Sequence, residues 1–137
     1  MAWPAPSGTT GWCGNRHHPG RTGSRLPAHL SAEGPPVVKM YILVRESVPV
    51  GFAVLATAHA SLAAYLKFRD SPEVAAWLSG PFYKVVCKVS DEEFERAKAF
   101  EDHVVLTESA LDGQEVAVAF KPREEWPKAF KFFKLYR

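Results

Sequence analysis

Residues 51–68 read GFAVLATAHASLAAYLKF and decide the fold, because they form the longest helical pattern in the chain. Apolar side chains recur three, four or seven positions apart, as at Phe52, Leu55, Leu62 and Leu66, which is the spacing of one helix face. Val54 adds apolar surface on another side, so we expect a helix that is buried nearly all round. Small side chains keep its surface low, so that neighbours can pack closely: Ala53, Ala56, Ala58, Ala60, Ala63 and Ala64.

The same stretch is about as long as a membrane span, which needs roughly 20 apolar residues. Polar side chains interrupt it at Thr57, His59 and Ser61, and strand-like patterns flank it on both sides. We therefore expect a core helix and no membrane partner.

Length and composition favour one domain with a real core. The chain has 137 residues, of which 47% are hydrophobic, and this length is typical of a single domain. The net charge of +2 comes from residues 1–39, which carry +3, while residues 40–137 carry −1. Because the predicted folded part is nearly neutral, its bulk charge gives no argument for a nucleic-acid partner.

Residues 1–36 are predicted to be a disordered N-terminal extension that precedes a domain over residues 37–137. This extension holds six prolines and six glycines and shows no apolar periodicity, a composition typical of disorder. It also lacks the continuous apolar stretch of a secretory signal. The two cysteines, Cys13 and Cys87, do not have metal-binding spacing, so we expect a cytoplasmic protein without a metal or cofactor.

Four segments have strand patterns. Residues 37–44, VVKMYILV, are almost continuously apolar, as in a central strand covered on both faces. Residues 82–89 alternate between apolar side chains and lysines, which favours a place towards a sheet edge. Residues 103–107 and 115–120 follow. The last of these carries Val116, Val118 and Phe120 on one face, and Ala117 and Ala119 on a face small enough for a helix to lie on.

Two further helices have N-terminal signals, and a third closes the chain. Ser71 followed by Pro72 is predicted to cap a short helix, and SDEE at residues 90–93 is a capping box. Residues 124–137 are predicted to form an amphipathic helix whose Trp126, Phe130 and Phe133 dock on the body of the domain.

The element order is therefore β-α-α-β-α-β-β plus a C-terminal helix. Helices between strands of this kind predict the α/β class, here a small α/β/α sandwich on a mixed four-stranded sheet.

The C-terminal end is locally basic, with a charge of +4 from residue 121 onward. Lys128, Lys131 and Lys134 line one side of the predicted helix. They are either the solvated face of a docked helix or a patch that faces phosphates, since lysines beside aromatic rings suit a nucleic-acid backbone.

The order and several motifs resemble the type 2 peptidyl-tRNA hydrolase family, in particular a divergent branch of it. The motifs are VVKMYILVR, then PVG, an alanine-rich helix with an AHA triplet, and the ending FFKLYR. The resemblance covers residues 37–137. It implies the sandwich fold, hydrolysis of the ester that joins a peptide to tRNA, and tRNA as a partner, and it leaves a homodimer open.

The resemblance also assigns candidate site residues. The histidine of the AHA triplet is His59, and Glu108 or Asp112 is the nearby carboxylate, with Ser109 at the aligned position of the family's aspartate. Where the family has a lysine after the helix-opening glycine, this chain has Phe52. Ala56 replaces the family's glutamine.

These replacements matter because ester hydrolysis needs a positioned water, a base and stabilisation of the oxyanion. Arg45 or Lys39 could replace the missing cation, and Arg45 with the three C-terminal lysines is the expected substrate-binding set. His59 could be the base, since histidine titrates near neutral pH. The other interpretation, which we favour, is a buried core histidine that bonds to a backbone carbonyl.

Two functions follow. The first is a peptidyl-tRNA hydrolase, which the basic C-terminal end supports. The second is a non-catalytic binding or dimeric interaction domain of the same fold, which the missing lysine and glutamine favour.

Overall fold

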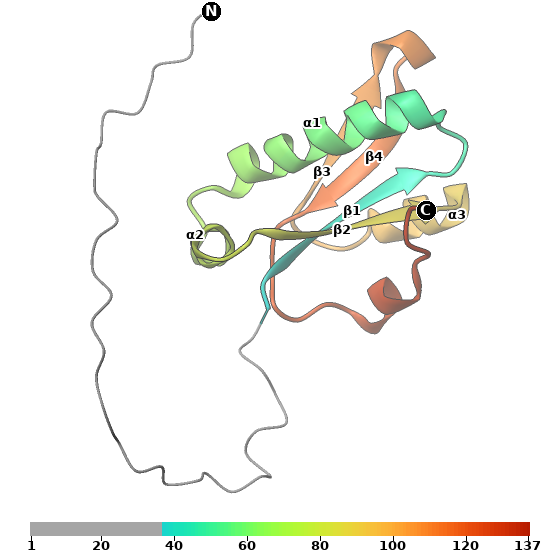
Figure 1. Ribbon diagram of the computed structural model, residues 1–137. Helices are drawn as coiled ribbons and strands as arrows, with labels where there is room; N and C mark the ends of the chain where they lie inside the picture. Colours follow the sequence, from blue (N-terminus) through green and yellow to red (C-terminus); the bar gives the residue numbers. More distant parts are fainter. Residues whose placement is uncertain (1–36) are drawn as a thin grey trace, which may run out of the picture. The chain divides into compact units, whose positions relative to one another are not determined.

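The structure, a computed structural model, describes residues 37–137, and the extension expected for residues 1–36 lies outside them. The described part forms a sheet with helices on both faces (Figure 1). Its elements are β1 Lys39–Arg45, α1 Val50–Phe68, α2 Pro72–Ser79, β2 Tyr83–Val89, α3 Asp91–Ala97, β3 His103–Glu108 and β4 Gln114–Phe120.

The sheet is mixed and has the strand order β2-β1-β4-β3. The central strand β1 runs parallel to β2 and antiparallel to β4, and β3 pairs antiparallel with β4. The predicted class, element order and four-stranded mixed sheet are thereby confirmed, with β1 in the centre and β2 at an edge.

The period of two along β1 divides the core into two clusters. Met40, Ile42 and Val44 point to the face covered by α1 and α2. Tyr41 and Leu43 point to the face covered by α3. Successive side chains of a strand alternate between faces, so Lys39 and Arg45 also belong to the α3 face.

Helix α1 lies on the sheet through its alanines. Its buried residues are Ala53, Ala56, Ala60 and Ala64, and they belong to the same cluster as Ala117 and Ala119 of β4. Small residues on both surfaces let the helix approach closely, as the sequence predicted. The capping box over residues 90–93 is also confirmed at the start of α3.

The expectation that α1 is buried nearly all round is wrong. Val54 and Leu62 on its outer side are 68% and 56% exposed, because the sheet lies beneath one side of the helix only. By length and composition alone α1 would suffice to cross a membrane, although a core helix passes the same test.

A β-bulge in β4 changes which face its first residues point to. Leu106 pairs with Ala117 and Thr107 pairs with Glu115, so Val116 is an extra residue with no counterpart on β3. Such an insertion shifts the alternation of the strand by one residue. Val116 therefore joins the α1 cluster, contrary to the face predicted for it.

The predicted C-terminal helix over residues 124–137 is wrong. A 3₁₀ turn spans Lys128–Phe132, and the chain then runs extended along the outer edge of β2. There Lys88 N donates to Lys134 O and Tyr136 N donates to Val86 O, both at 2.9 Å. Pro127 disfavours a helix through its neighbours, and the unpaired edge of β2 offers the tail hydrogen bonds instead.

Candidate functional site

The start of α1 holds the two positions where the resemblance asks for polar chemistry. Phe52 is partly buried and packs against the α1-side core. Ala56, one turn later, is only 4% exposed and faces the sheet. The side chain of Phe52 carries no charge, and the methyl group of Ala56 neither donates nor accepts a hydrogen bond.

His59 lies on the outer side of α1 and is exposed. The interpretation of His59 as a buried histidine is therefore wrong. The histidine bonded to a backbone carbonyl is His103, whose Nδ1 lies 2.7 Å from Phe100 O. The physical reason is that Ala56 and Ala60 occupy the side of α1 that faces the sheet. His59, which lies between them in the sequence, is therefore on a side of the helix that is open to solvent.

The two candidate carboxylates lie in the connection between β3 and β4. Glu108 ends β3, and its Oε1 accepts a hydrogen bond of 3.0 Å from Ala110 N. Asp112 is exposed and has a positive φ of 55°, as suits a turn before Gly113. Among residues 37–137, no described hydrogen bond or ion pair joins either carboxylate to His59. His59 is therefore not hydrogen-bonded to Glu108 or to Asp112 in the described part of the chain.

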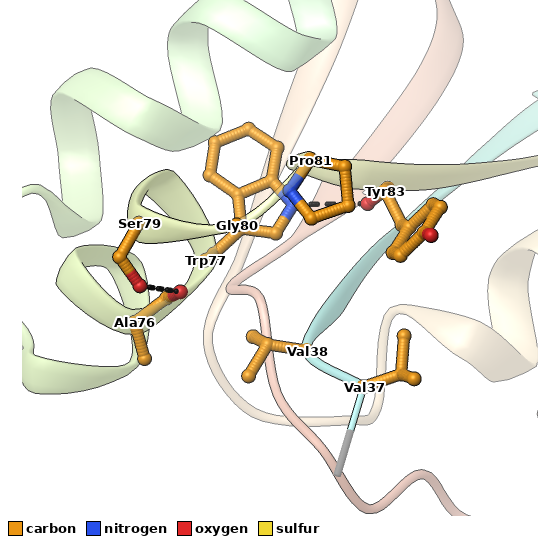
Figure 2. A pocket seen from close by; sticks show the side chains of 8 residues that line it. All are labelled: Val37, Val38, Ala76, Trp77, Ser79, Gly80, Pro81 and Tyr83. Atoms are coloured by element: carbon orange, nitrogen blue, oxygen red, sulfur yellow. Dashed lines mark hydrogen bonds between the residues drawn. The ribbon is translucent and has the colours of Figure 1, made fainter. Parts of the chain in front are cut away.

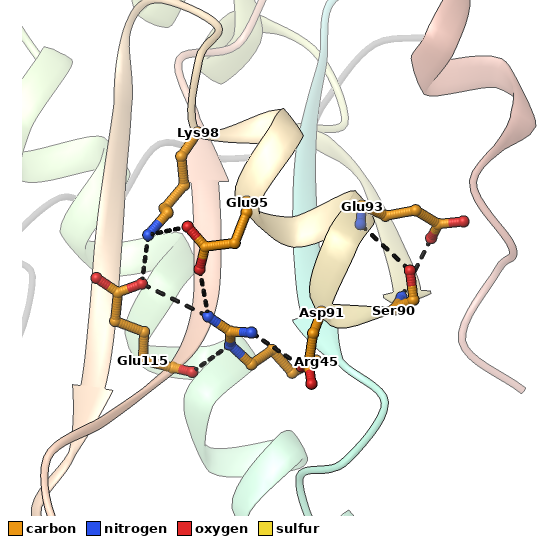
Figure 3. A network of polar contacts seen from close by, with 7 residues as sticks. All are labelled: Arg45, Ser90, Asp91, Glu93, Glu95, Lys98 and Glu115. Carbon is orange, nitrogen blue, oxygen red and sulfur yellow. Dashed lines mark hydrogen bonds and ion pairs between the residues drawn. The ribbon is translucent and has the colours of Figure 1, made fainter.

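Arg45 is the centre of a charged network on the α3 face (Figure 3). Its guanidinium lies 2.8 Å from Asp91 Oδ1 and 2.7 Å from Glu95 Oε1, and its Nε donates to Glu115 O at 2.8 Å. The same group stacks over the ring of Phe94, 4.1 Å from its centroid. Its side chain is 12% exposed, and all three guanidinium nitrogens form hydrogen bonds within the domain.

Lys98 completes this network from the end of α3. Its Nζ lies 2.8 Å from Glu95 and 2.7 Å from Glu115. Hydrogen bonds from Lys98 and from Arg45 lower the pKa of Glu95. Bonds to Glu115 and Glu95 raise the pKa of Lys98. Three elements, β1, α3 and β4, are thus tied together by alternating charges, with Glu115 turned to this face by the bulge.

The three C-terminal lysines belong to a segment that begins on the α3 side of the sheet and ends along the edge of β2. Lys128, Lys131 and Lys134 are exposed, while Phe130 of the same segment is buried in the α3-side cluster. At the other end of the segment, Tyr136 packs against the α1-side cluster, the layer that also carries His59. Among residues 37–137, no hydrogen bond or ion pair joins the three lysines to His59.

Two of the cavities in the described part of the chain are formed by segments other than α1. One of about 360 Å³ opens where β1 and β2 begin and α2 ends (Figure 2). Trp77 forms its inner wall, with Nε1 donating to Tyr83 O at 2.9 Å. A second of about 340 Å³ lies between α3 and the C-terminal segment, beside Phe100 and Phe132. Neither is lined by His59, Glu108 or Asp112.

Metal and thiol chemistry find no support in the described residues. In the part of the chain that the structure describes, no group of three or more His, Cys, Asp or Glu side chains could hold a metal ion. Cys87 is buried, and burial together with the charge of Glu93 raises its pKa to about 11. A thiol with that pKa is a poor nucleophile at neutral pH.

Sequence reasoning missed the charged network around Arg45. The spacing of Glu95 and Lys98 on one helix was a signal for half of it. The other half depends on the bulge at Val116, for which residues 114–120 carry no glycine or other marker.

Comparison with known proteins agrees with the fold. No individually curated protein matches the chain. The family model described as peptidyl-tRNA hydrolase PTH2 matches residues 38–125, more than half of the chain. The match includes β1 to β4 and α1 to α3, and it stops before the basic C-terminal segment. The chain therefore belongs to the peptidyl-tRNA hydrolase PTH2 family.

Proposed function

We propose that this protein is a non-hydrolysing PTH2-family domain that binds tRNA through its C-terminal segment. The observation that carries the proposal is the packing of Phe52 against the core, at the position where the resemblance asks for a lysine. Without a cation there, the first turns of α1 carry no charged side chain that could stabilise the oxyanion formed when an ester is attacked.

The two cations considered as replacements serve other contacts. Arg45 is bound by three carboxylates on the α3 face. Lys39 also points to that face, with its Nζ 5.5 Å from the ring centroid of Tyr41. Both therefore lie on the other face of the sheet from His59.

The binding half of the proposal rests on the C-terminal segment. Lys128, Lys131 and Lys134 are exposed, and none takes part in an ion pair with another described residue. Between them Phe132 is 76% exposed. Lysines that neutralise phosphates, beside a ring on which an unpaired base can stack, are the elements of sequence-independent RNA binding.

A second candidate is the family's own reaction, and the exposure of His59 favours it. An exposed imidazole can meet a water molecule and accept a proton from it, as a general base does. In that case Glu108 or Asp112 would have to move to orient the ring, since neither is bonded to it in the structure.

The two candidate functions, binding without hydrolysis and hydrolysis, are distinguished by incubating the full chain with peptidyl-tRNA that is labelled on the peptide. The expected result is a complex in which the ester stays intact. Binding should weaken with salt, because counterions are released from the RNA. Replacing the three lysines together by glutamine should weaken binding at low salt and make it less salt-dependent. Replacing Lys67 and Lys84, which stack on rings of α1 and α2, is the matched control. Absence of tRNA binding, or cleavage of the bound ester, would contradict the proposal.

A further inference from the structure

The cavity of about 340 Å³ between α3 and the C-terminal segment combines flat apolar walls with two charged side chains. Its volume lies near the lower end of the range for ligand pockets, about 300–1,000 Å³. Two of its lining residues come from one turn of α3, and the others named here supply rings and one methyl group: Glu93, Arg96, Phe100, Ala129, Phe132 and Phe133.

We propose that this cavity receives an unpaired base of single-stranded RNA, and that the base carries an exocyclic amino group, as cytosine and adenine do. Cytosine presents an amino donor where uracil presents a carbonyl oxygen, so such a site distinguishes the two. The inference rests on the proposed RNA binding and deepens it, because it identifies the part of the RNA that the C-terminal segment recognises.

The 3₁₀ turn of the C-terminal segment presents three different sides. Residues three positions apart lie above one another in such a turn. One side carries Phe130 and is buried in the core. A second side carries Ala129 and Phe132, which line the cavity. The third carries Lys128 and Lys131, both exposed, so the phosphates that flank a bound base lie within reach of two cations.

The core holds two of the rings that line the cavity. Phe130 contacts the rings of Phe100 and Phe133 edge-on, with centroids 5.1 Å and 5.3 Å away. Because Phe130 is itself 1% exposed, these contacts fix both rings as a preformed apolar wall. Phe132, by contrast, is 76% exposed. Its ring is free to stack on a base, and aromatic stacking of this kind is the usual way in which proteins hold unpaired bases.

Glu93 gives the cavity a hydrogen-bond acceptor in a fixed position. The capping box holds it, since its Oε2 accepts a hydrogen bond from Ser90 N and its own N donates to Ser90 Oγ, both at 3.2 Å. Figure 3 shows the other carboxylate oxygen turned away from Ser90. An amino group of a base can donate to that oxygen, whereas a carbonyl oxygen at the same place would be repelled.

The charge around the cavity suits a polyanion. Arg96 lies one turn after Glu93, is exposed, and forms no ion pair within residues 37–137. With Lys128 and Lys131 on the adjacent side of the turn, three cations stand against the one carboxylate of the lining. A guanidinium can pair with a phosphate or stack on a base. An apolar peptide in the same place would leave these cations without a partner.

The first test measures binding of the full chain to short fluorescent RNAs by anisotropy. Oligocytidylate and oligouridylate are both pyrimidine strands, so the amino group is the main difference between them. The wild type should bind oligocytidylate about tenfold more tightly, which corresponds to 1.4 kcal/mol. Glu93→Gln should remove this preference, because its amide keeps an acceptor for Ser90 N but can pair with either base.

The second test changes the cavity and leaves the lysines in place. Phe132→Ala should raise the Kd for oligocytidylate about tenfold, the effect of losing one stacked base. Ala129→Leu should act in the same direction by filling the cavity. An RNA duplex has no unpaired base, so its Kd should stay unchanged in both variants. Tyr83→Ala removes a ring that is 52% exposed at the start of β2, and as the matched control it should change neither Kd.

The outcomes separate this inference from the proposed function. Equal affinity for the two oligonucleotides would overturn the inference, as would a Phe132→Ala variant that binds oligocytidylate like the wild type. If the triple lysine variant still weakens tRNA binding in that case, the proposed function stands without the cavity. A wild type that binds no RNA would overturn both. Should Ala129→Leu fail to fold, the exposed Phe132→Ala site still decides the question.

Discussion

Arg45 shows how one residue type can support two different interpretations until its surroundings are known. In the sequence alone, an arginine at the end of an apolar strand is a candidate for binding a phosphate group. The alternation of β1 turns it instead to the α3 face, where Asp91 and Glu95 neutralise it. Each exposed ion pair adds little to the stability of the fold. Arg45, however, is only 12% exposed and shares its guanidinium among several partners, so ordering this one side chain costs less entropy per bond than separate pairs would.

Glu95 gives a pH test of this network. Bonds to Lys98 and Arg45 lower its pKa below the ordinary value of 4.5. Around that pH the unfolded chain therefore binds more protons than the folded one. The stabilisation is complete above pH 4.5 and is lost as the pH falls through the lowered pKa of the folded state.

Glu95→Gln should therefore lower the unfolding midpoint at pH 7 and flatten its decline below pH 4.5. Thermal unfolding followed by circular dichroism over the acidic range is the measurement. The matched control is Glu92→Gln, an exposed site on the same helix, which should follow the wild-type curve. Parallel acid profiles for the wild type and Glu95→Gln would show that the network adds nothing.

At the scale of elements, the C-terminal segment shows that the spacing of aromatic residues predicts which side chains are buried but does not predict the conformation of the backbone. Trp126, Phe130 and Phe133 were expected to dock on the domain, and they pack against the α3-side cluster. Their helical spacing was misleading about the backbone. Residues that bury rings can do so from a 3₁₀ turn followed by an extended tail, and Pro127 together with the free edge of β2 decides in favour of that conformation.

Phe130 should anchor this segment. Its ring is 1% exposed and lies among those of Tyr41, Phe100, Phe120 and Trp126, with centroids 4.9–5.2 Å away. Phe130→Ala should lower the free energy of unfolding by about 3–5 kcal/mol, because it leaves a cavity in the core. Phe132→Ala, two residues away and exposed, should change it by less than about 0.5 kcal/mol. Urea unfolding measures both, and equal stabilities for the two variants would mean that the segment is not docked.

At the scale of the whole molecule, the sequence predicted the topology well and the site poorly. Strand and helix patterns repeat over many residues, so the order β-α-α-β-α-β-β and the alanine contact between α1 and β4 could be derived. A site depends on single side chains from distant segments. Whether His59 points inward, and whether Glu108 or Asp112 meets it, depends on helix rotation and on the β3–β4 connection, which residue spacing does not determine.

The most direct test of a non-hydrolysing PTH2 domain is the single-turnover rate of peptidyl-tRNA cleavage with the full chain in excess. A hydrolase of this family serves as the positive control. The expected result is a rate equal to the uncatalysed rate, both for the wild type and for His59→Ala, because Phe52 and Ala56 supply no charge or hydrogen bond to the reaction. A wild-type rate well above the uncatalysed one that falls back in His59→Ala, with the unfolding midpoint unchanged, would contradict it and establish the protein as a hydrolase.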